Sequence, residues 1–395
     1  MTPAARTQAA IELLDAIIVS ARDGGAAADT LVARYFAERR YAGSKDRRAV
    51  RALVYDAIRM LGERPDSGRA AMLALADTRP DIAAHFGGDG HAPPAIEPGE
   101  PRARPGLVPK WLGRMLTASG IDRVQQAALL ERAPLDIRVN PLRGDVPTVQ
   151  AAFPEAQPIA GLPNGLRLPP DSSVERHPLF ETGAVEVQDA GSQLVSLASA
   201  ARPGMTVIDL CAGGGGKTLA LAAMMDNNGR IVASDIDRGR LSRLPARAER
   251  AGVTIADTLL LDGGREGDAL ERFAASADLV VIDAPCSGTG TWRRNPEARW
   301  RLNPDRLARL NATQARLLDL GSRCVKPGGA LLYIVCSLLD AEGSDQVQGF
   351  LARNPGWTVA DVDAAIGAAH GPGRRLTPAD HSTDGFFVAM MRAPC

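Results

Sequence analysis

VVIDAPCSGTGTWRRNPEARW, residues 280 to 300, opens as an apolar run and continues into side chains that can react. The run Leu279 to Ile282 is typical of a parallel strand buried on both faces, and it stops at Asp283. In open α/β sheets, functional side chains lie at such strand ends. Asp283 can hydrogen-bond the amide-like edge of a base, and Cys286 offers a polarisable thiol beside it. The alternative is an ordinary glycine and serine loop that contains a buried cysteine.

Two other stretches have the same form, a buried strand followed by small or reactive residues. Met205 to Cys211 is strand-like, the glycine-rich loop Ala212 to Thr218 follows it, and a helix is expected after the loop. Such a loop presents backbone N–H groups that can bind a carboxylate or a phosphate. Downstream, the apolar run Ala330 to Val335 ends at Cys336. The two cysteines and Asp283 are therefore expected at neighbouring strand ends.

Together, the three stretches resemble the RNA cytosine-5 methyltransferase family, in its Sun/RsmB (Nop/Sun) branch. The family pattern is Asp-x-Cys-Ala-Ala-Pro-Gly-Gly-Lys-Thr, then Asp-Ala-Pro-Cys-Ser-Gly, then Thr-Cys-Ser, and the resemblance extends over nearly the whole chain. Gly213 and Gly214 stand where the family usually has Ala-Pro, and Val335 replaces the threonine before the last cysteine. These departures soften a loop and remove one hydroxyl, but neither removes a reacting group.

The resemblance implies methylation of cytosine C5 in RNA, with small-subunit ribosomal RNA as the expected substrate and S-adenosyl-L-methionine as the methyl donor. Cytosine C5 is a poor nucleophile, and a thiolate that adds to C6 makes C5 enamine-like. By resemblance, Cys336 is the nucleophile, Asp283 contacts N3 of the base, and Cys286 assists release of the product. These three residues are the expected catalytic groups.

The cofactor is expected in the glycine loop and beside the acids that end the next two strands. Asp235 ends the second strand, where a carboxylate can accept both ribose hydroxyls, and Asp262 ends the third, where it can meet the adenine amine. The alternatives are a helix cap for Asp235 and a turn residue for Asp262. The expected cofactor-binding residues are Cys211, Ala212, Gly213, Gly214, Gly215, Gly216, Lys217, Asp235, Asp262 and Asp283.

The composition predicts an ordinary soluble protein in a reducing cytoplasm. Of 395 residues, 45% are hydrophobic and 23% charged, and no apolar run approaches the roughly 20 residues that a membrane-spanning helix needs. The opening residues carry acids within an apolar pattern, which indicates a helix and not a signal peptide. Cysteine is rare and lacks zinc-ligand spacing, so no metal site is expected. Three cysteines are assigned to the core or the tail: Cys211, Cys324 and Cys395.

Acidic and basic residues balance at 46 each, so contacts to RNA must come from local patches. The segment Arg34 to Arg48 combines arginines with aromatic residues, and a solvated helix surface is the alternative. Its expected RNA contacts are Arg39, Arg40, Lys45, Arg47 and Arg48. A second arginine-rich stretch follows the catalytic loop and contains Trp292 and Trp300, which suits stacking on single-stranded nucleotides.

Four segments are expected along the chain. Residues 1–86 are helical and resemble a NusB-type RNA-binding domain, 87–106 form a glycine- and proline-rich linker, and 107–183 form a small α/β subdomain with leading helices. Residues 184–395 alternate strand and helix, as in a seven-stranded, doubly wound, Rossmann-like methyltransferase domain. A monomer without membrane contact is expected. The predicted strands are 206–210, 231–235, 258–261, 279–282, 330–335, 358–362 and 386–391.

Several other functions remain open on the sequence alone. A non-catalytic RNA-binding or assembly protein could keep this fold, and a methyltransferase of the same branch could act on tRNA. In a DNA cytosine methyltransferase the nucleophile would be the Pro-Cys thiol of Cys286, and Cys336 would be dispensable. A nicotinamide oxidoreductase would leave the paired cysteines without a role.

Overall fold

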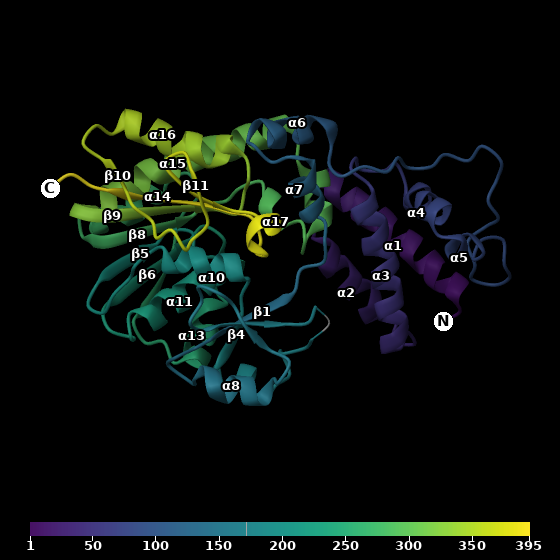
Figure 1. Ribbon diagram of the computed structural model, residues 1–395, viewed down its shortest axis with the longest axis horizontal. Helices are drawn as coiled ribbons and strands as arrows, with labels where there is room; N and C mark the ends of the chain where they lie inside the picture. The colour runs from purple at the N-terminus through teal and green to yellow at the C-terminus, as the bar shows by residue number, and fades with distance from the viewer. Residues whose placement is uncertain (171) are drawn as a thin grey trace. The chain divides into compact units, whose positions relative to one another are not determined.

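The computed structural model describes residues 1–170 and 172–395, which form two compact units (Figure 1). The first unit comprises Met1–Glu131 and Thr291–Asn303, and the second comprises Arg132–Gly290 and Pro304–Cys395. The first unit therefore includes the helices near residue 120, which the sequence assigns to the small α/β subdomain, and a short stretch from the catalytic half of the chain. Within the described ranges, no helix is both long enough and apolar enough to cross a membrane.

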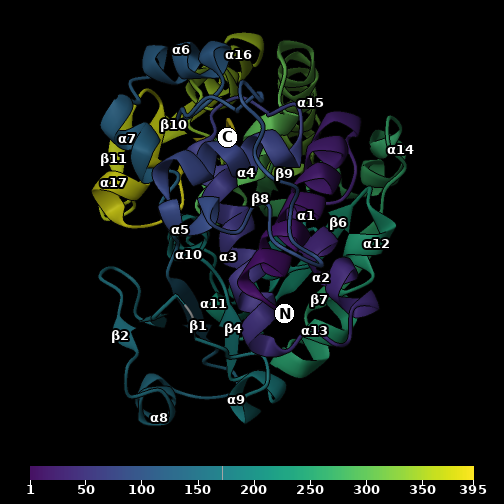
Figure 2. The same cartoon turned by 90° about the vertical axis from the view of Figure 1, so that its right-hand side faces the viewer.

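The first unit is helical, as predicted. Helices α1 to α4 pack side by side, and Leu13 and Ile17 of α1 are fully buried at the predicted helical spacing (Figures 1 and 2). Because these positions recur every three to four residues, they form one apolar face that packs on α3 and α4. The helices are α1 Pro3–Asp23, α2 Ala28–Glu38, α3 Ser44–Met60, α4 Gly68–Thr78, α5 Pro80–Ala83, α6 Lys110–Ala118, α7 Arg123–Ala128 and the 3₁₀ turn η3 Pro296–Arg301.

The turn η3 inserts into this helical core from more than two hundred residues away. Arg299 is fully buried, and its guanidinium donates to the carbonyls of Ile58 at 2.6 Å and Leu61 at 2.8 Å. The last carbonyls of a helix lack partners within the helix, so the arginine satisfies the end of α3. Trp300 and Trp292 are also buried. The prediction that both tryptophans stack on nucleotides is therefore wrong, because the rings fill protein interior.

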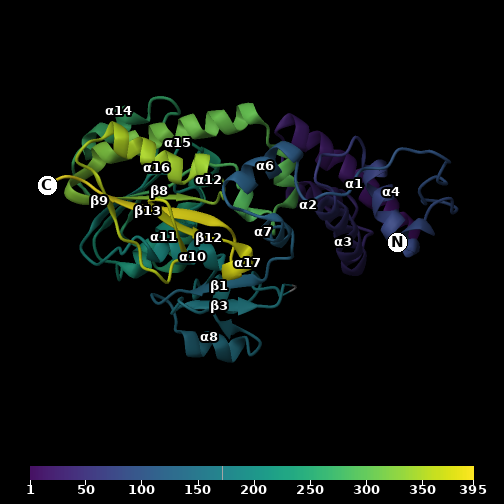
Figure 3. The same ribbon diagram turned by 45° about the horizontal axis from the view of Figure 1, so that its top comes forward.

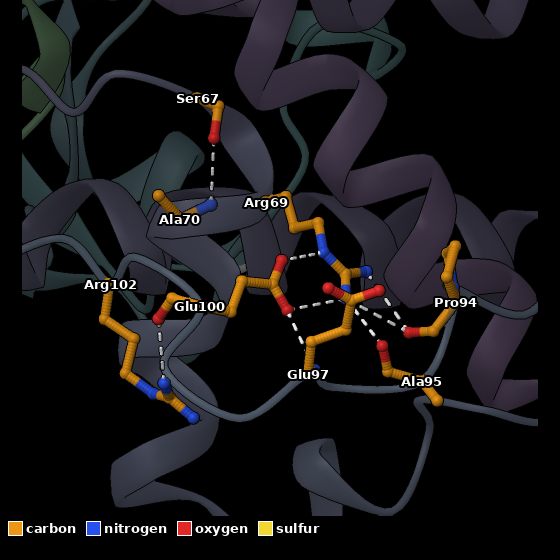
Figure 4. A network of polar contacts seen from close by, with 8 residues as sticks. All are labelled: Ser67, Arg69, Ala70, Pro94, Ala95, Glu97, Glu100 and Arg102. Carbon is orange, nitrogen blue, oxygen red and sulfur yellow. Dashed lines mark hydrogen bonds and ion pairs between the residues drawn. The ribbon is translucent and has the colours of Figure 1, made fainter.

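The glycine- and proline-rich stretch 87–106 lies against α4 (Figure 4). Arg69 of α4 is ion-paired with Glu100, and it also donates to the carbonyls of Pro94 at 3.2 Å and Ala95 at 3.0 Å. The N–H of Ala103 donates to the carbonyl of Ala70 at 3.0 Å. The stretch lacks regular structure, as its composition predicts, but the half-buried Arg69 side chain holds it against α4.

A nine-stranded sheet forms the centre of the second unit, in the order β11-β12-β13-β9-β8-β5-β6-β7, with β10 also paired to β13. Strands β5 to β9 are parallel, and β13 is antiparallel to β9. This arrangement confirms the predicted Rossmann-like, doubly wound sheet, and all seven predicted strands are present. The strands are β5 Thr206–Asp209, β6 Arg230–Asp235, β7 Ala256–Leu260, β8 Ala277–Asp283, β9 Val325–Val335, β10 Thr358–Ala360, β11 Ala368–His370, β12 Gly373–Leu376 and β13 Phe386–Arg392.

Helices cover both faces of this sheet (Figure 1). Alternate strand residues divide between the faces: Val207 packs with α10, α11 and α13, and Ile208 packs with α15. The sequence pattern predicts one helix from Arg238 to Ala251, but the segment forms two helices, because Pro245 lacks the N–H that a helix interior needs. The helices are α10 Ala190–Leu197, α11 Gly216–Met224, α12 Arg238–Leu241 and α13 Leu244–Ala251 on one face, and α14 Glu266–Leu270, α15 Pro304–Cys324 and α16 Ser344–Arg353 on the other, with α17 Pro378–His381 before β13.

A four-stranded antiparallel sheet, in the order β2-β3-β1-β4, completes the second unit (Figure 3). Arg138 of β1 is buried and donates to the Gln188 side chain at 2.8 Å. Asn140 donates to the carbonyls of Gly183 at 2.9 Å and Ala251 at 2.8 Å. Both polar residues therefore stabilise the fold. The elements are β1 Leu135–Val139, α8 Val146–Ala152, β2 Gln157–Pro158, β3 Gly165–Leu168, α9 Pro178–Glu181 and β4 Val185–Val187.

Candidate active site

A pocket of about 220 Å³ lies at the carboxyl ends of β5 and β8. The strand order reverses between these neighbours, since the chain proceeds from β5 to β6 and β7 on one side and to β8 and β9 on the other. Open α/β sheets bind ligands at such a reversal. Six of the predicted cofactor-binding residues line it: Cys211, Ala212, Gly214, Gly216, Lys217 and Asp283. The other lining residues are Gln188, Ser192, Asp209 and Arg240.

The glycine loop has a backbone path that only glycine follows without strain. Gly213 and Gly215 have φ of 55° and 84°, in the left-handed region. A Cβ at Gly213 would lie 2.5 Å from the guanidinium of Arg240, and one at Gly215 would overlap Leu244. Gly213, one of the departures from the family pattern, therefore leaves the space that the Arg240 side chain occupies.

Asp235 fixes the same loop from the end of β6. One carboxylate oxygen accepts the N–H of Gly213 and the other accepts the N–H of Asp237, each at 2.8 Å. Asp262 lies exposed after β7, and its carbonyl accepts the N–H of Arg265 in a turn. Neither acid lines the pocket directly. Their contacts to ribose and adenine remain predictions.

Asp283 and Lys217 form an ion pair, with 2.7 Å between the carboxylate and Nζ. Lys217 comes from the first turn of α11 and is almost completely buried, whereas Asp283 is partly exposed at the end of β8. Burial alone would lower the pKa of Lys217, but the charge of Asp283 and its hydrogen bond outweigh burial and raise it. The lysine therefore remains an ammonium that faces the predicted base-binding acid.

The two predicted catalytic thiols lie 3.3 Å apart, measured between the sulfurs of Cys286 and Cys336. They follow β8 and β9, which pair in parallel with Asp283 opposite Ile334. The hydrogen bond to Cys336, burial and the negative charge of Glu342 together raise the pKa of Cys286 well above its usual value. Cys286 therefore retains its proton and can donate its S–H to the other sulfur. All five cysteines are free thiols. Cys324 is buried in α15, and Cys395 is exposed in the tail.

Asp209 lines the pocket and was not predicted as a site residue. It is fully buried at the end of β5, and the hydroxyl of Thr218 donates to one carboxylate oxygen at 2.7 Å. The other oxygen has no hydrogen-bond partner in the described part of the chain. Burial raises the pKa of Asp209 to about 7, although the Thr218 hydrogen bond opposes the shift. Asp209 is an acid at the end of a strand, as Asp283 is, and this feature of the sequence could have identified it as a site residue.

The raised pKa of Asp209 predicts a pH-dependent stability. An unfolded aspartate titrates near 3.9, so the folded chain binds the extra proton between roughly pH 4 and pH 7, and stability falls as pH rises through this window. Asp209→Asn removes the fall, which amounts to at most about 4 kcal/mol by linkage. Melting temperatures are measured at pH 4.5 and 8. The melting temperature of Asp209→Asn relative to the parent should be higher at pH 8 than at pH 4.5, whereas that of the exposed Asp257→Asn should not change with pH. An equal difference at both values would contradict the assignment.

A glycine loop after the first strand of a doubly wound sheet, with a pocket and an acid at the switch point, defines the class of proteins that bind a nucleotide-type cofactor there. The family model described as 16S rRNA methyltransferase RsmB/F matches residues 197–392. Ribosomal RNA small subunit methyltransferase B of Xylella fastidiosa is 35% identical over 293 residues, which cover 72% of this chain and 68% of that protein. The chain belongs to this RsmB/F family of RNA methyltransferases, and its cofactor is S-adenosylmethionine.

Solved structures share the fold. The crystal structure of PH0851 matches with a TM-score of 0.77 and 24% identity, over 99% of both chains. The structure of NSun6 from Pyrococcus horikoshii with SFG matches with a TM-score of 0.65 and 18% identity, over 72% of this chain and 98% of that one. The likeness to PH0851 therefore includes the helical unit as well as the methyltransferase domain.

Proposed function

We propose that this protein methylates C5 of a cytosine in small-subunit ribosomal RNA, in a reducing cytoplasm. The observation that carries the proposal is the pair of thiols 3.3 Å apart, at strand ends next to the Lys217–Asp283 ion pair. The name of the Xylella relative supports the substrate. Neither a DNA-type enzyme nor an oxidoreductase needs both thiols. Bisulfite sequencing of RNA from a deletion strain and its parent tests the substrate. Loss of methylation at a cytosine in tRNA, and not in rRNA, would make tRNA the substrate instead.

The residues around the pocket fit S-adenosylmethionine. Backbone N–H groups of the glycine loop suit its carboxylate, and the unpartnered oxygen of Asp209 suits a cationic group. When bound, the cofactor supplies an electrophilic methyl group. The protein has to activate the base and orient it toward that methyl group.

Activation begins at Cys336, whose sulfur lies 3.3 Å from that of Cys286. The sulfur adds to C6 of cytosine, an S–C6 bond forms, and the electron pair of the C5–C6 double bond moves into the ring toward N3. N3 takes up a proton from solvent as this charge develops and returns it on product release. Asp283 accepts a hydrogen bond from the N3–H, and the Lys217 ammonium, 2.7 Å from that carboxylate, stabilises it. The ring now carries a nucleophilic C5.

Release reverses the addition. After C5 takes the methyl group and its proton passes to solvent, the C–H electron pair restores the double bond and the S–C6 bond breaks. The leaving sulfur of Cys336 then carries a negative charge, which the S–H of Cys286 at 3.3 Å is placed to stabilise. Cys286 therefore assists product release, and its loss affects a later step than loss of Cys336.

Asp235→Ala is expected to weaken S-adenosylmethionine binding about tenfold or more, since a charge-assisted hydrogen bond contributes roughly 1.5 to 3 kcal/mol. The carboxylate also holds Gly213, so its loss loosens the glycine loop as well. Calorimetry with the cofactor measures the change, and the exposed Asp268→Ala is the matched control. Unchanged affinity in a folded Asp235→Ala protein would refute the role.

We also infer that the helical unit contributes RNA affinity through its basic segment. Arg40, Lys45, Arg47 and Arg48 are exposed, and Tyr41 next to them is 74% exposed. Arg39 lies over the Tyr35 ring at 3.7 Å, and Arg47 donates to the carbonyl of Ala42 at 2.9 Å. The exposed members are therefore the first candidates for phosphate contacts, in keeping with the predicted NusB-type role.

Replacing Arg40, Lys45 and Arg48 together by glutamine should reduce the salt dependence of RNA binding. Each lost phosphate contact lowers the slope of log affinity against log salt by about 0.7 to 0.9. Filter binding at several salt concentrations measures the slope, with Arg22→Gln as an exposed control in the same unit. Equal slopes for the triple variant and the parent would mean that the segment is only a solvated surface.

A further inference from the structure

Glu342 is a completely buried carboxylate that has no role in the chemistry proposed above. It ends the 3₁₀ turn η4, Asp340–Glu342, which follows the loop that carries Cys336. Burying a carboxylate is unfavourable unless donors satisfy it. The donors that surround Glu342 come mainly from the residues that directly follow the two catalytic cysteines.

On the side of β8, Glu342 binds Ser287, the neighbour of Cys286. One carboxylate oxygen accepts the Ser287 N–H at 2.8 Å, and the other accepts its hydroxyl. A backbone N–H cannot rotate away as a hydroxyl can, so this contact fixes the chain at the residue after the thiol. Gln314 of α15 reinforces the position, since its amide donates to Glu342 at 3.1 Å and to the carbonyl of Pro285 at 3.0 Å.

On the side of β9, the same carboxylate binds Ser337, the neighbour of Cys336. The Ser337 hydroxyl lies 2.5 Å from the oxygen that also accepts the Ser287 hydroxyl. Thr289 bridges the loops a second time: its hydroxyl is 3.0 Å from that of Ser337, and it accepts the N–H of Leu338 at 2.9 Å. One buried acid thus joins the residues after both thiols.

We propose that Glu342 is a positioning residue that sets the separation of the Cys286 and Cys336 thiols by tying together the serines that follow them. The proposal deepens the two-cysteine function above and rests on it for its catalytic consequence. The contacts themselves are independent of RNA and cofactor. The negative charge of Glu342 has a second effect on the thiol pair. It contributes to the raised pKa of Cys286 and so helps to keep the proton on that sulfur.

The separation can be measured through disulfide formation in the folded protein. Glutathione disulfide oxidises the two thiols to one S–S bond, and two molecules of glutathione take up the two electrons and two protons. A disulfide requires the sulfurs to approach to about 2.05 Å in a narrow range of angles, so the equilibrium constant reports their placement. Glu342→Met keeps the side-chain length and removes both acceptors. We expect the constant to fall at least tenfold.

The matched control is Glu266→Met, which removes another buried carboxylate, one that pairs with Arg316 and touches neither cysteine loop. Its constant should equal that of the parent. If Glu342→Met does not fold, the milder double variant Ser287→Ala, Ser337→Ala carries the test, with a smaller fall in the same direction. An unchanged constant in a folded variant that lacks these contacts overturns the proposal.

A second measurement separates this proposal from the proposed function. In Glu342→Met, kcat for methyl transfer should fall while KM for S-adenosylmethionine stays the same, because Glu342 does not line the cofactor pocket. If the disulfide constant falls but the parent protein does not methylate RNA, the positioning role stands and the proposed function fails. If the parent protein methylates RNA but the disulfide constant of Glu342→Met is unchanged, the proposed function stands and the positioning role fails.

Discussion

Cys336→Ala is expected to reduce methyl transfer by a factor on the order of 10⁴ or more, because without the thiolate C5 of cytosine is not activated. The same change should abolish covalent attachment of the protein to RNA. Transfer of a labelled methyl group from S-adenosylmethionine measures the first effect. Cys324→Ala is the matched control: that cysteine is buried in α15 and outside the site, so activity should be retained. Full activity in Cys336→Ala would remove the residue from the reaction.

Cys286→Ala should have the opposite effect on the covalent adduct and make it accumulate. The alanine cannot donate a hydrogen to the leaving sulfur, which in the parent lies 3.3 Å from the Cys286 thiol. Attack on C6 does not require this group, so the adduct forms and then breaks down slowly. A denaturing gel of labelled RNA with protein and S-adenosylmethionine should show a band shifted by the mass of the protein. No adduct in either cysteine variant, with methylation intact in one of them, would remove the covalent mechanism.

The sequence predicts the inner strands of the central sheet well because they are buried on both faces. Parallel strands of this kind are continuous apolar runs, such as Leu279 to Ile282, and need no alternation to be recognised. The hairpin of β11 and β12 was missed, since Ala-Ala-His and Gly-Arg-Arg-Leu are short, polar and at the sheet edge. Pro245 marks the break between α12 and α13 in the sequence. The helical spacing of the residues around it nevertheless predicted one continuous helix.

The reactive groups were also accessible from the sequence, because each follows a strand that the sequence identifies. Parallel pairing of β8 and β9 brings Cys286, Cys336 and Asp283 together, and Lys217 reaches Asp283 from α11. The supporting groups were not accessible. Glu342 contacts a serine 55 residues earlier in the chain, and no local pattern encodes that distance.

The arginine-rich stretch shows how charge patterns mislead. Arg299 and Trp300 look like an RNA-binding pair in sequence, but they close the end of α3 about 240 residues away. A guanidinium satisfies several carbonyls at once, so an arginine in a core can replace helix capping. Arg299 and Trp300 are therefore poorer candidates for RNA contacts than the exposed basic residues around Tyr41.

The identity of the attacking sulfur is the central claim, and peptide mapping of the trapped adduct tests it most directly. Cys286→Ala protein is incubated with RNA and S-adenosylmethionine, digested with protease and nuclease, and analysed by mass spectrometry for the peptide that carries the nucleotide. We expect the nucleotide to be attached to Cys336 in this variant and the Cys336→Ala protein to give no adduct. A nucleotide attached to Cys286 in the Cys336→Ala protein, with no adduct in Cys286→Ala, would contradict this expectation and assign the DNA-type nucleophile.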